Sequence, residues 1–201
     1  SASKIEGTTS RGPKKLDIDA VQASRSNFFV GVTDMNGEGH FLDAKKATPS
    51  FWSAMYASSA TPLAYRTPHR INGGLYVDGG IALAFPIKKV IDEFSPTDVL
   101  VLPNCPQDQK HILTFCERLF LKFFFAHLPS FVRARTLLRH EDFCVGIEFV
   151  KSAHNIHVLW PPNARIHELS RNPQKLRNAA YTSVSKTLAV FGKSNLQFEL
   201  H

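Results

Sequence analysis

The chain has 201 residues, of which 43% are hydrophobic, and a formal net charge of +7. This length and composition predict one globular domain over residues 16–192, with a flexible lead-in over 1–15 and a tail over 193–201. The longest apolar run, over 119–126, contains a lysine and is too short to cross a bilayer, which argues against a membrane span.

The positive charge favours anionic partners, either lipid headgroups or nucleic acid. Because the basic residues are scattered and no aromatic-basic motif accompanies them, nucleic acid is not an expected partner. A function as a general DNA-binding protein is therefore the least favoured of the functions weighed from the sequence. The cysteines Cys105, Cys116 and Cys144 have no Cys-x-x-Cys spacing and predict neither a disulfide framework nor a zinc site. We therefore expect a reducing, cytoplasmic location, with peripheral attachment to an anionic membrane as an option.

Ordered structure is expected to begin at about Leu16 and to lead into two strands. Residues 27–33 are aromatic and β-branched with almost no polar interruption, which is typical of a central strand covered on both faces. Residues 34–39 supply turn chemistry, and 40–42 are expected to return as a short antiparallel strand. Asp34 is expected to cap this turn, the alternative being that it lines a site.

The next elements are a helix and a hairpin. A helix is predicted from Pro49 to about Ser58, with Thr48 as the capping residue before the proline. Asn72-Gly73 predicts a tight reversal into a strand over 75–78. Asp78 ends that strand and two glycines follow, so a carboxylate is carried to the end of a buried strand. The Asp-Gly pair by itself is also ordinary turn sequence.

A helix is predicted to follow Pro86, and residues 98–102 are predicted to form a second buried strand. This β-α-β succession implies a parallel pair of strands. The fold class expected is therefore α/β, with a mainly parallel sheet flanked by helices.

Two helices are expected between 109 and 140, divided near Pro129. The aromatic-rich stretch 111–125 is expected to pack in the core, although its basic residues would also suit a membrane surface. Residues 141–152 fit either a helix or a strand, and we favour a helix.

The chain is expected to end with a strand and a long helix. Residues 156–160 are predicted as a short strand, and Asn172-Pro173 begins a helix that stops at Gly192. The face expected to be buried consists of Leu176, Ala180, Val184, Leu188 and Phe191.

Four blocks of the chain, in this order, resemble the C-terminal part of a patatin-like phospholipase domain of bacterial type. They are Phe28–Asp34 (FFVGVTD), Ala57–Pro62 (ASSATP), Gly74–Gly80 (GLYVDGG) and Phe85–Ile87 (FPI). The resemblance runs from about Leu16 to Gly192. It implies a three-layer α/β domain that is incomplete at its N-terminal side.

Proteins of this family hydrolyse lipid acyl esters with a serine-aspartate dyad and without metal or another cofactor. The resemblance implies that Asp78 is the general base, and that the backbone amides of Gly79 and Gly80 stabilise its charged form and lie near the substrate. The family's Gly-x-Ser-x-Gly elbow and its glycine-rich oxyanion loop do not occur in residues 1–201.

The chain is therefore expected to hold the base without the nucleophile. One reading is part of a lipid acyl hydrolase whose serine comes from a companion segment. The other is a truncated, non-catalytic relative that binds lipid or a protein.

Other candidate residues have plainer explanations. Ser58 and Ser59 lack the flanking glycines of a nucleophile elbow and are expected to be structural. His154 and His157 have a spacing that can suit a metal, yet no third ligand follows, so no metal site is expected.

Overall fold

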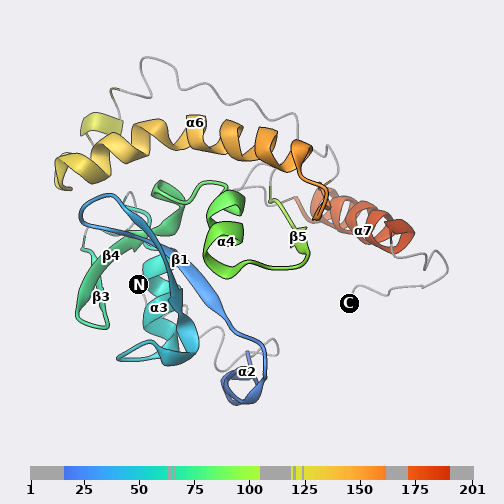
Figure 1. Cartoon of the computed structure of the whole chain (residues 1–201), viewed down its shortest axis with the longest axis horizontal. Coiled ribbons are helices and arrows are strands. Elements are labelled where there is room, and N and C mark those ends of the chain that lie inside the picture. The colour runs from blue at the N-terminus through green and yellow to red at the C-terminus, as the bar shows by residue number, and fades with distance from the viewer. Residues whose placement is uncertain are drawn as a thin grey trace. The chain divides into compact units, whose positions relative to one another are not determined.

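The structure is a computed structural model that describes residues 16–62, 65, 67–104, 119, 121–123, 125–161 and 172–190. The chain divides into two compact units (Figure 1). Unit 1 consists of Ser1–Lys89 and Ile112–Phe149, and unit 2 consists of Val90–His111 and Val150–His201. Within the described residues, no helix combines the length and the apolar composition that a bilayer crossing requires.

Unit 1 is built on a four-stranded sheet. In sheet order its strands are β2 (Gly39–Asp43), β1 (Phe29–Asp34), β4 (Gly74–Asp78) and β3 (His69–Ile71). Every neighbouring pair is antiparallel, so the expectation of a mainly parallel sheet is not confirmed. The physical reason is that β1–β2 and β3–β4 are joined by short turns, whereas a parallel pair needs a crossover of a dozen residues or more. The mixed α/β composition is as expected.

The β3–β4 hairpin forms as predicted. Asn72 and Gly73 have φ angles of 48° and 84°, the left-handed values that a two-residue hairpin turn requires. The side-chain oxygen of Asn72 accepts hydrogen bonds from the backbone amide and the hydroxyl of Thr48, at 2.8 and 2.7 Å. The hairpin turn is therefore tied to the segment just before helix α3 (Phe51–Ser58).

Two helices cover the core of the sheet. Helix α2 (Ile18–Ala23) is capped by Asp17, close to the predicted start of ordered structure. Helix α3 (Phe51–Ser58) is capped by Ser50, whose hydroxyl accepts from the Ser53 amide at 3.2 Å. The predicted start at Thr48-Pro49 was thus too early. Buried residues shared by α3, the strands and their connections form one core cluster, namely Val30, Val32, Ala44, Ala47, Phe51, Ala54, Ala57 and Ile71.

Helix α6 (Ser130–Ser152) begins directly after Pro129, as predicted, and continues to residue 152, so the helical interpretation of 141–152 is correct. Val132 at its start is fully buried in a second core cluster with Val77, Ile81, Phe125 and Leu128. The predicted helix over 109–128 lies largely outside the described residues.

Of the aromatic stretch 111–125, Phe125 packs in the core, while Leu119 and Phe123 are exposed.

Helix α4 (Ile87–Phe94) follows Pro86 as predicted. It leads to β5 (Val99–Val101) in unit 2, which pairs in parallel with β6 (Ile156–Val158). The expected parallel pairing of the 75–78 and 98–102 strands is therefore wrong, because β4 and β5 belong to different sheets.

Helix α7 (Pro173–Val190) is capped by Asn172, whose side chain accepts from the Lys175 amide at 3.1 Å. This confirms the predicted start of the last helix. Leu176, expected on its buried face, is 41% exposed, and Phe191 lies outside the described residues.

Candidate functional site

Asp78 is the last residue of β4 and caps the short 3₁₀-helix η2 (Gly79–Ile81). Its Oδ1 accepts a hydrogen bond from the Gly80 amide at 2.8 Å. Its Oδ2 accepts a short hydrogen bond from the hydroxyl of Thr61. The side chain is half-buried. The carboxylate is therefore held in one orientation by two neutral donors at the end of a central strand.

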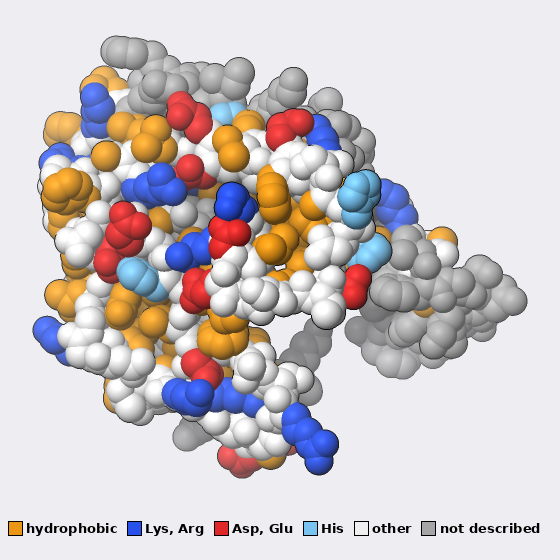
Figure 2. Space-filling model, viewed as in Figure 1, with side chains coloured by type: hydrophobic (Ala, Val, Ile, Leu, Met, Phe, Trp, Pro, Cys, Tyr) orange, Lys and Arg blue, Asp and Glu red, His pale blue; other side chains and the backbone are white. Residues whose placement is uncertain are grey.

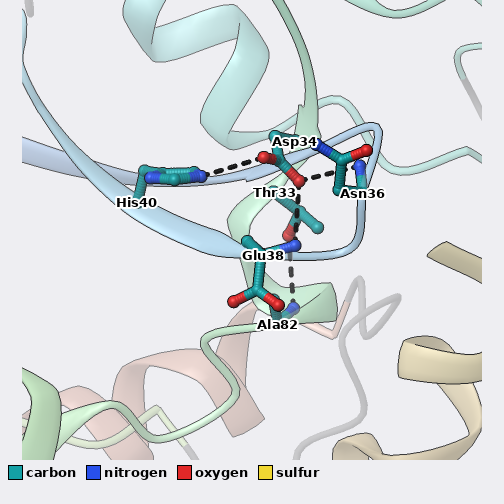
Figure 3. Close-up of polar contacts among 6 residues, drawn as sticks. All are labelled: Thr33, Asp34, Asn36, Glu38, His40 and Ala82. Atoms are coloured by element: carbon teal, nitrogen blue, oxygen red, sulfur yellow. Dashed lines mark hydrogen bonds and ion pairs between the residues drawn. The ribbon is translucent and has the colours of Figure 1, made fainter. Parts of the chain in front are cut away.

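The backbone around Asp78 is fixed from two sides. The hydroxyl of Thr33, which is 0% exposed, donates to the carbonyl oxygen of Asp78 at 2.8 Å and accepts from the Ala82 amide at 3.2 Å. The Asp78 amide donates to the carbonyl oxygen of Ala60 at 3.2 Å. Figure 3 shows the Thr33–Ala82 contact beneath the β1–β2 turn. The strand end and the 3₁₀-helix after it are thus joined to β1 and to the segment that carries Thr61.

The two glycines after Asp78 have different roles. A Cβ atom on Gly79 would lie 2.2 Å from the carbonyl oxygen of Gly31 in β1, so only glycine fits there. Among the described residues, the amide that bonds the Asp78 carboxylate is that of Gly80, not that of Gly79. A Cβ on Gly80 would lie 3.1 Å from Asp78 Oδ1 and 3.6 Å from Nη2 of Arg139. Gly79 therefore permits close packing, while Gly80 contacts the carboxylate directly.

Asp34, at the end of β1, caps the following turn as predicted. Its Oδ1 accepts from the amides of Asn36 and Glu38, both at 2.9 Å, and its Oδ2 lies 3.1 Å from Nε2 of His40 (Figure 3). Burial by itself would raise the pKa of Asp34, but the hydrogen bonds from Glu38, His40 and Asn36 outweigh burial, and the pKa is lowered. These contacts give Asp34 a structural role in the turn.

The other predicted candidates do not join Asp78. Ser58 ends α3 and Ser59 is its C-cap, whose amide returns to Tyr56 at 3.2 Å. The residues that bond the Asp78 carboxylate, in the part of the chain that the structure describes, are Thr61 and Gly80 instead. Ser58 and Ser59 are thus placed as helix-end residues.

The histidines proposed as rivals lie in unit 2. His157, in β6, has its Nε2 3.8 Å from Oδ1 of Asp98, and both side chains are mostly exposed. Within the described ranges, no group of three or more His, Cys, Asp or Glu residues is arranged to hold a metal.

Sequence reasoning missed two neighbours of Asp78. Thr61 lies in one of the blocks that carry the family resemblance, but no local pattern marks its hydroxyl as a partner of the acid. Arg139 lies in α6 and reaches Gly80 only through the tertiary fold. A search for polar residues within the resembling blocks would have found Thr61. No local sequence pattern links Arg139 to Asp78.

Figure 2 shows how charge is distributed on the face that it presents. Lysine and arginine side chains alternate there with acidic and hydrophobic ones and form no continuous basic stripe. Nucleic-acid binding requires such a stripe to neutralise several phosphates. This face therefore offers no support for the DNA-binding hypothesis.

The comparison with protein families gives one finding. Residues 6–91 match the family model described as patatin-like phospholipase. The matched segment contains all four strands of the main sheet together with Asp78, Gly79 and Gly80. It covers less than half of the 201 residues. No curated protein matches the chain.

Proposed function

We propose, because residues 6–91 match the patatin-like phospholipase family model, that this chain supplies the general base of a lipid acyl hydrolase and that Asp78 is that base. The substrate is a lipid acyl ester, and the reaction is its hydrolysis to a fatty acid and an alcohol. A cytoplasmic location with peripheral contact to an anionic membrane is part of the same proposal.

The chemistry assigned to Asp78 is proton transfer. A serine Oγ, supplied by a companion segment outside residues 1–201, attacks the ester carbonyl carbon while its proton passes to the Asp78 carboxylate. The proton then moves to the leaving alkoxide, which departs as the alcohol. The same carboxylate then takes a proton from water, whose oxygen attacks the acyl carbon. The bond between that carbon and the serine Oγ breaks, the proton passes from Asp78 to the Oγ, and the fatty acid leaves.

One observation supports this role most directly: the Asp78 carboxylate is fixed in place by neutral donors alone. Thr61 and Gly80 each occupy one lone pair of a different oxygen, and a carboxylate has about four acceptor positions. In the described part of the chain, no cation lies within ion-pair distance of Asp78. Lone pairs therefore remain to accept a proton, and no ion pair has to break first.

The test is ester hydrolysis by the full native polypeptide, with p-nitrophenyl butyrate as substrate. Asp78→Asn keeps the shape of the side chain and one of its two acceptor oxygens but removes the base. We expect kcat to fall by about 10²–10⁴-fold, the usual contribution of a general base. Asp43→Asn is the matched control, because Asp43 also ends a strand of this sheet and caps a 3₁₀-helix. Turnover retained by Asp78→Asn, with unchanged circular dichroism, would remove Asp78 from the mechanism.

A second function is favoured by the absence of Gly-x-Ser-x-Gly from residues 1–201: a non-catalytic relative that binds lipid or a protein. Fluorophosphonate labelling and ester hydrolysis by the 201-residue chain alone discriminate the two. We expect neither labelling nor turnover from this chain. A native polypeptide that is also inert would favour the binding function. Labelling of any serine in the chain would instead contradict the need for a companion segment.

A further inference from the structure

Helix α6 packs along the edge of unit 1 that contains the end of β4. Near its start, the backbone of Phe131 approaches Gly37 in the β1–β2 turn, where a Cβ would lie only 3.0 Å from the Phe131 carbonyl oxygen. Further along, Gly146 packs against Phe85, and a Cβ on Gly146 would lie 2.6 Å from the Phe85 carbonyl oxygen. Two glycines thus allow close backbone contact at both ends of this stretch, which fixes the position of the helix between them.

Arg139 lies between these two contacts. Its Nη2 and Cζ are 3.6 and 3.9 Å from the position that a Cβ of Gly80 would take, and Asp78 Oδ1 is 3.1 Å from the same position. Because Gly80 has no side chain, this position is empty. The guanidinium of Arg139 and the carboxylate of Asp78 therefore border the same small space.

Arg139 is exposed and makes no ion pair within the described residues. Asp142, three residues further along the same helix, is paired with Arg135 at 3.1 Å. A guanidinium that lies near a proposed active-site acid and forms no ion pair within the described residues is suited to bind an anion from outside the protein. Arginine presents five donors in a planar fork that matches phosphate geometry.

We propose that Arg139 binds the phosphate of a phospholipid substrate and so directs its acyl ester toward Asp78. The inference rests on the proposed hydrolase function, and it makes Arg139 a specificity-determining residue. In a glycerophospholipid, the phosphate and the acyl esters are attached to one three-carbon backbone, so a single molecule can contact Arg139 and present its ester to Asp78. Neutral esters lack the phosphate and would gain nothing from Arg139.

Kinetics of the full native polypeptide on two substrates test the proposal. We expect Arg139→Gln to raise KM for a lysophosphatidylcholine by about 10- to 100-fold, because a charged hydrogen-bonded contact is lost. The KM for p-nitrophenyl butyrate should change far less, so that the ratio of the two KM values rises. Arg139→Lys should be intermediate, since lysine keeps the charge but not the fork. Arg135→Gln is the control on the same helix, and it should leave the ratio of the two substrates unchanged.

An equal fall in kcat for both substrates would overturn the proposal and assign Arg139 to electrostatic support of Asp78. An unchanged substrate ratio would overturn it as well.

A binding measurement separates failure of this inference from failure of the proposed function. Dodecylphosphocholine has a phosphate but no acyl ester, so its binding by calorimetry, below its micelle-forming concentration, does not depend on turnover. We expect binding to the native protein, about tenfold or greater weakening in Arg139→Gln, and competition by millimolar inorganic phosphate. Binding that depends on Arg139 in a protein without esterase activity would refute the hydrolase function alone. Equal binding by both proteins would refute the role of Arg139. Binding of inorganic phosphate without binding of the lipid analogue would overturn the proposal and identify a free-anion site instead.

Discussion

Two strands of the main sheet, β2 and β4, end in the same local structure. Each ends on an aspartate that caps a 3₁₀-helix, namely Asp43 before η1 (Ala44–Lys46) and Asp78 before η2. In each, Oδ1 accepts from the amide two residues later, at 3.0 Å from Lys45 and 2.8 Å from Gly80. The backbone device is the same, so the difference between the two ends lies in their surroundings.

The second carboxylate oxygen shows that difference. Asp43 Oδ2 forms an ion pair with Nζ of Lys46 at 3.1 Å, and the Lys46 side chain is 84% exposed. Asp78 Oδ2 receives the hydroxyl of Thr61, a residue distant in the chain. The two ends also differ in the residue after the aspartate. Asp43 is followed by Ala44, whose methyl group is buried, whereas Asp78 is followed by Gly79. The two strand ends therefore share the same helix cap. What distinguishes the Asp78 end is the neutral donor Thr61 and the close packing of Gly79 against β1.

The largest effect is expected from exchanging the residue after each aspartate. Gly79→Ala places a methyl group 2.2 Å from the Gly31 carbonyl oxygen, a backbone atom that cannot move aside without shifting β1. We expect the free energy of unfolding, measured by urea titration, to fall by about 3 kcal/mol or more, at the upper end of overpacking costs. Ala44→Gly should cost only about 1 kcal/mol, for the lost methyl burial and the added backbone freedom. Equal costs at both positions would show that the contact between Gly79 and β1 does not distinguish the two ends.

A smaller effect is expected from removing the second donor at each end. Thr61→Val removes the hydroxyl from a half-buried carboxylate, and we expect a loss of about 1.5–3 kcal/mol in unfolding free energy at neutral pH. Thr61→Ser should restore most of it. Lys46→Met removes an exposed ion-pair partner and should cost less than about 0.5 kcal/mol. If Thr61→Val were as mild as Lys46→Met, the hydroxyl would not be what orients Asp78.

The smallest effect concerns pH at the Asp43 end. Burial would raise the pKa of Asp43, but the hydrogen bonds from Lys46 and Lys45 and their positive charges lower it below its usual 3.8. A lowered pKa in the folded state means that the ionised form contributes stability above the usual value, and that this contribution is lost as pH falls through the folded value.

We expect Asp43→Asn to reduce unfolding free energy by less than about 1 kcal/mol near neutral pH, and the difference from the native protein to vanish well below pH 3.8. Urea titrations across this range measure it. A difference that grew toward acid would contradict the sign of the shift.

Local sequence patterns predicted most elements of the fold. The Asn72-Gly73 turn, the strand ending at Asp78 and the cap at Asn172 depend on residues close in the chain, and all three are present. The order of strands in the sheets was not predictable in this way, because β4 pairs with β1, and β5 pairs with β6 from far along the chain. Pairing partners are set by the packing of the whole unit and leave little trace in a short window of sequence.

The candidate site was predictable only in its central residue. Asp78 stands out because an acid ends an apolar strand before two glycines. The sequence around Thr61 and Arg139 shows no unusual pattern. Thr61 is brought close to Asp78 by the turn after α3, and Arg139 is brought there by the direction of α6. The cap of α3 shows the same limit at short range: Thr48 and Ser50 are both good capping residues, and the structure uses the second.

The hydroxyl of Thr33 has a consequence for ligand recognition. It holds the carbonyl of Asp78 and the amide of Ala82 at the same time, so the bend between them cannot swing open without breaking both bonds together. A molecule that binds next to residues 78–82 therefore meets a backbone segment that is already ordered, and no loop has to fold around it first. Little conformational entropy is then lost on association, which raises the affinity for any molecule that binds there.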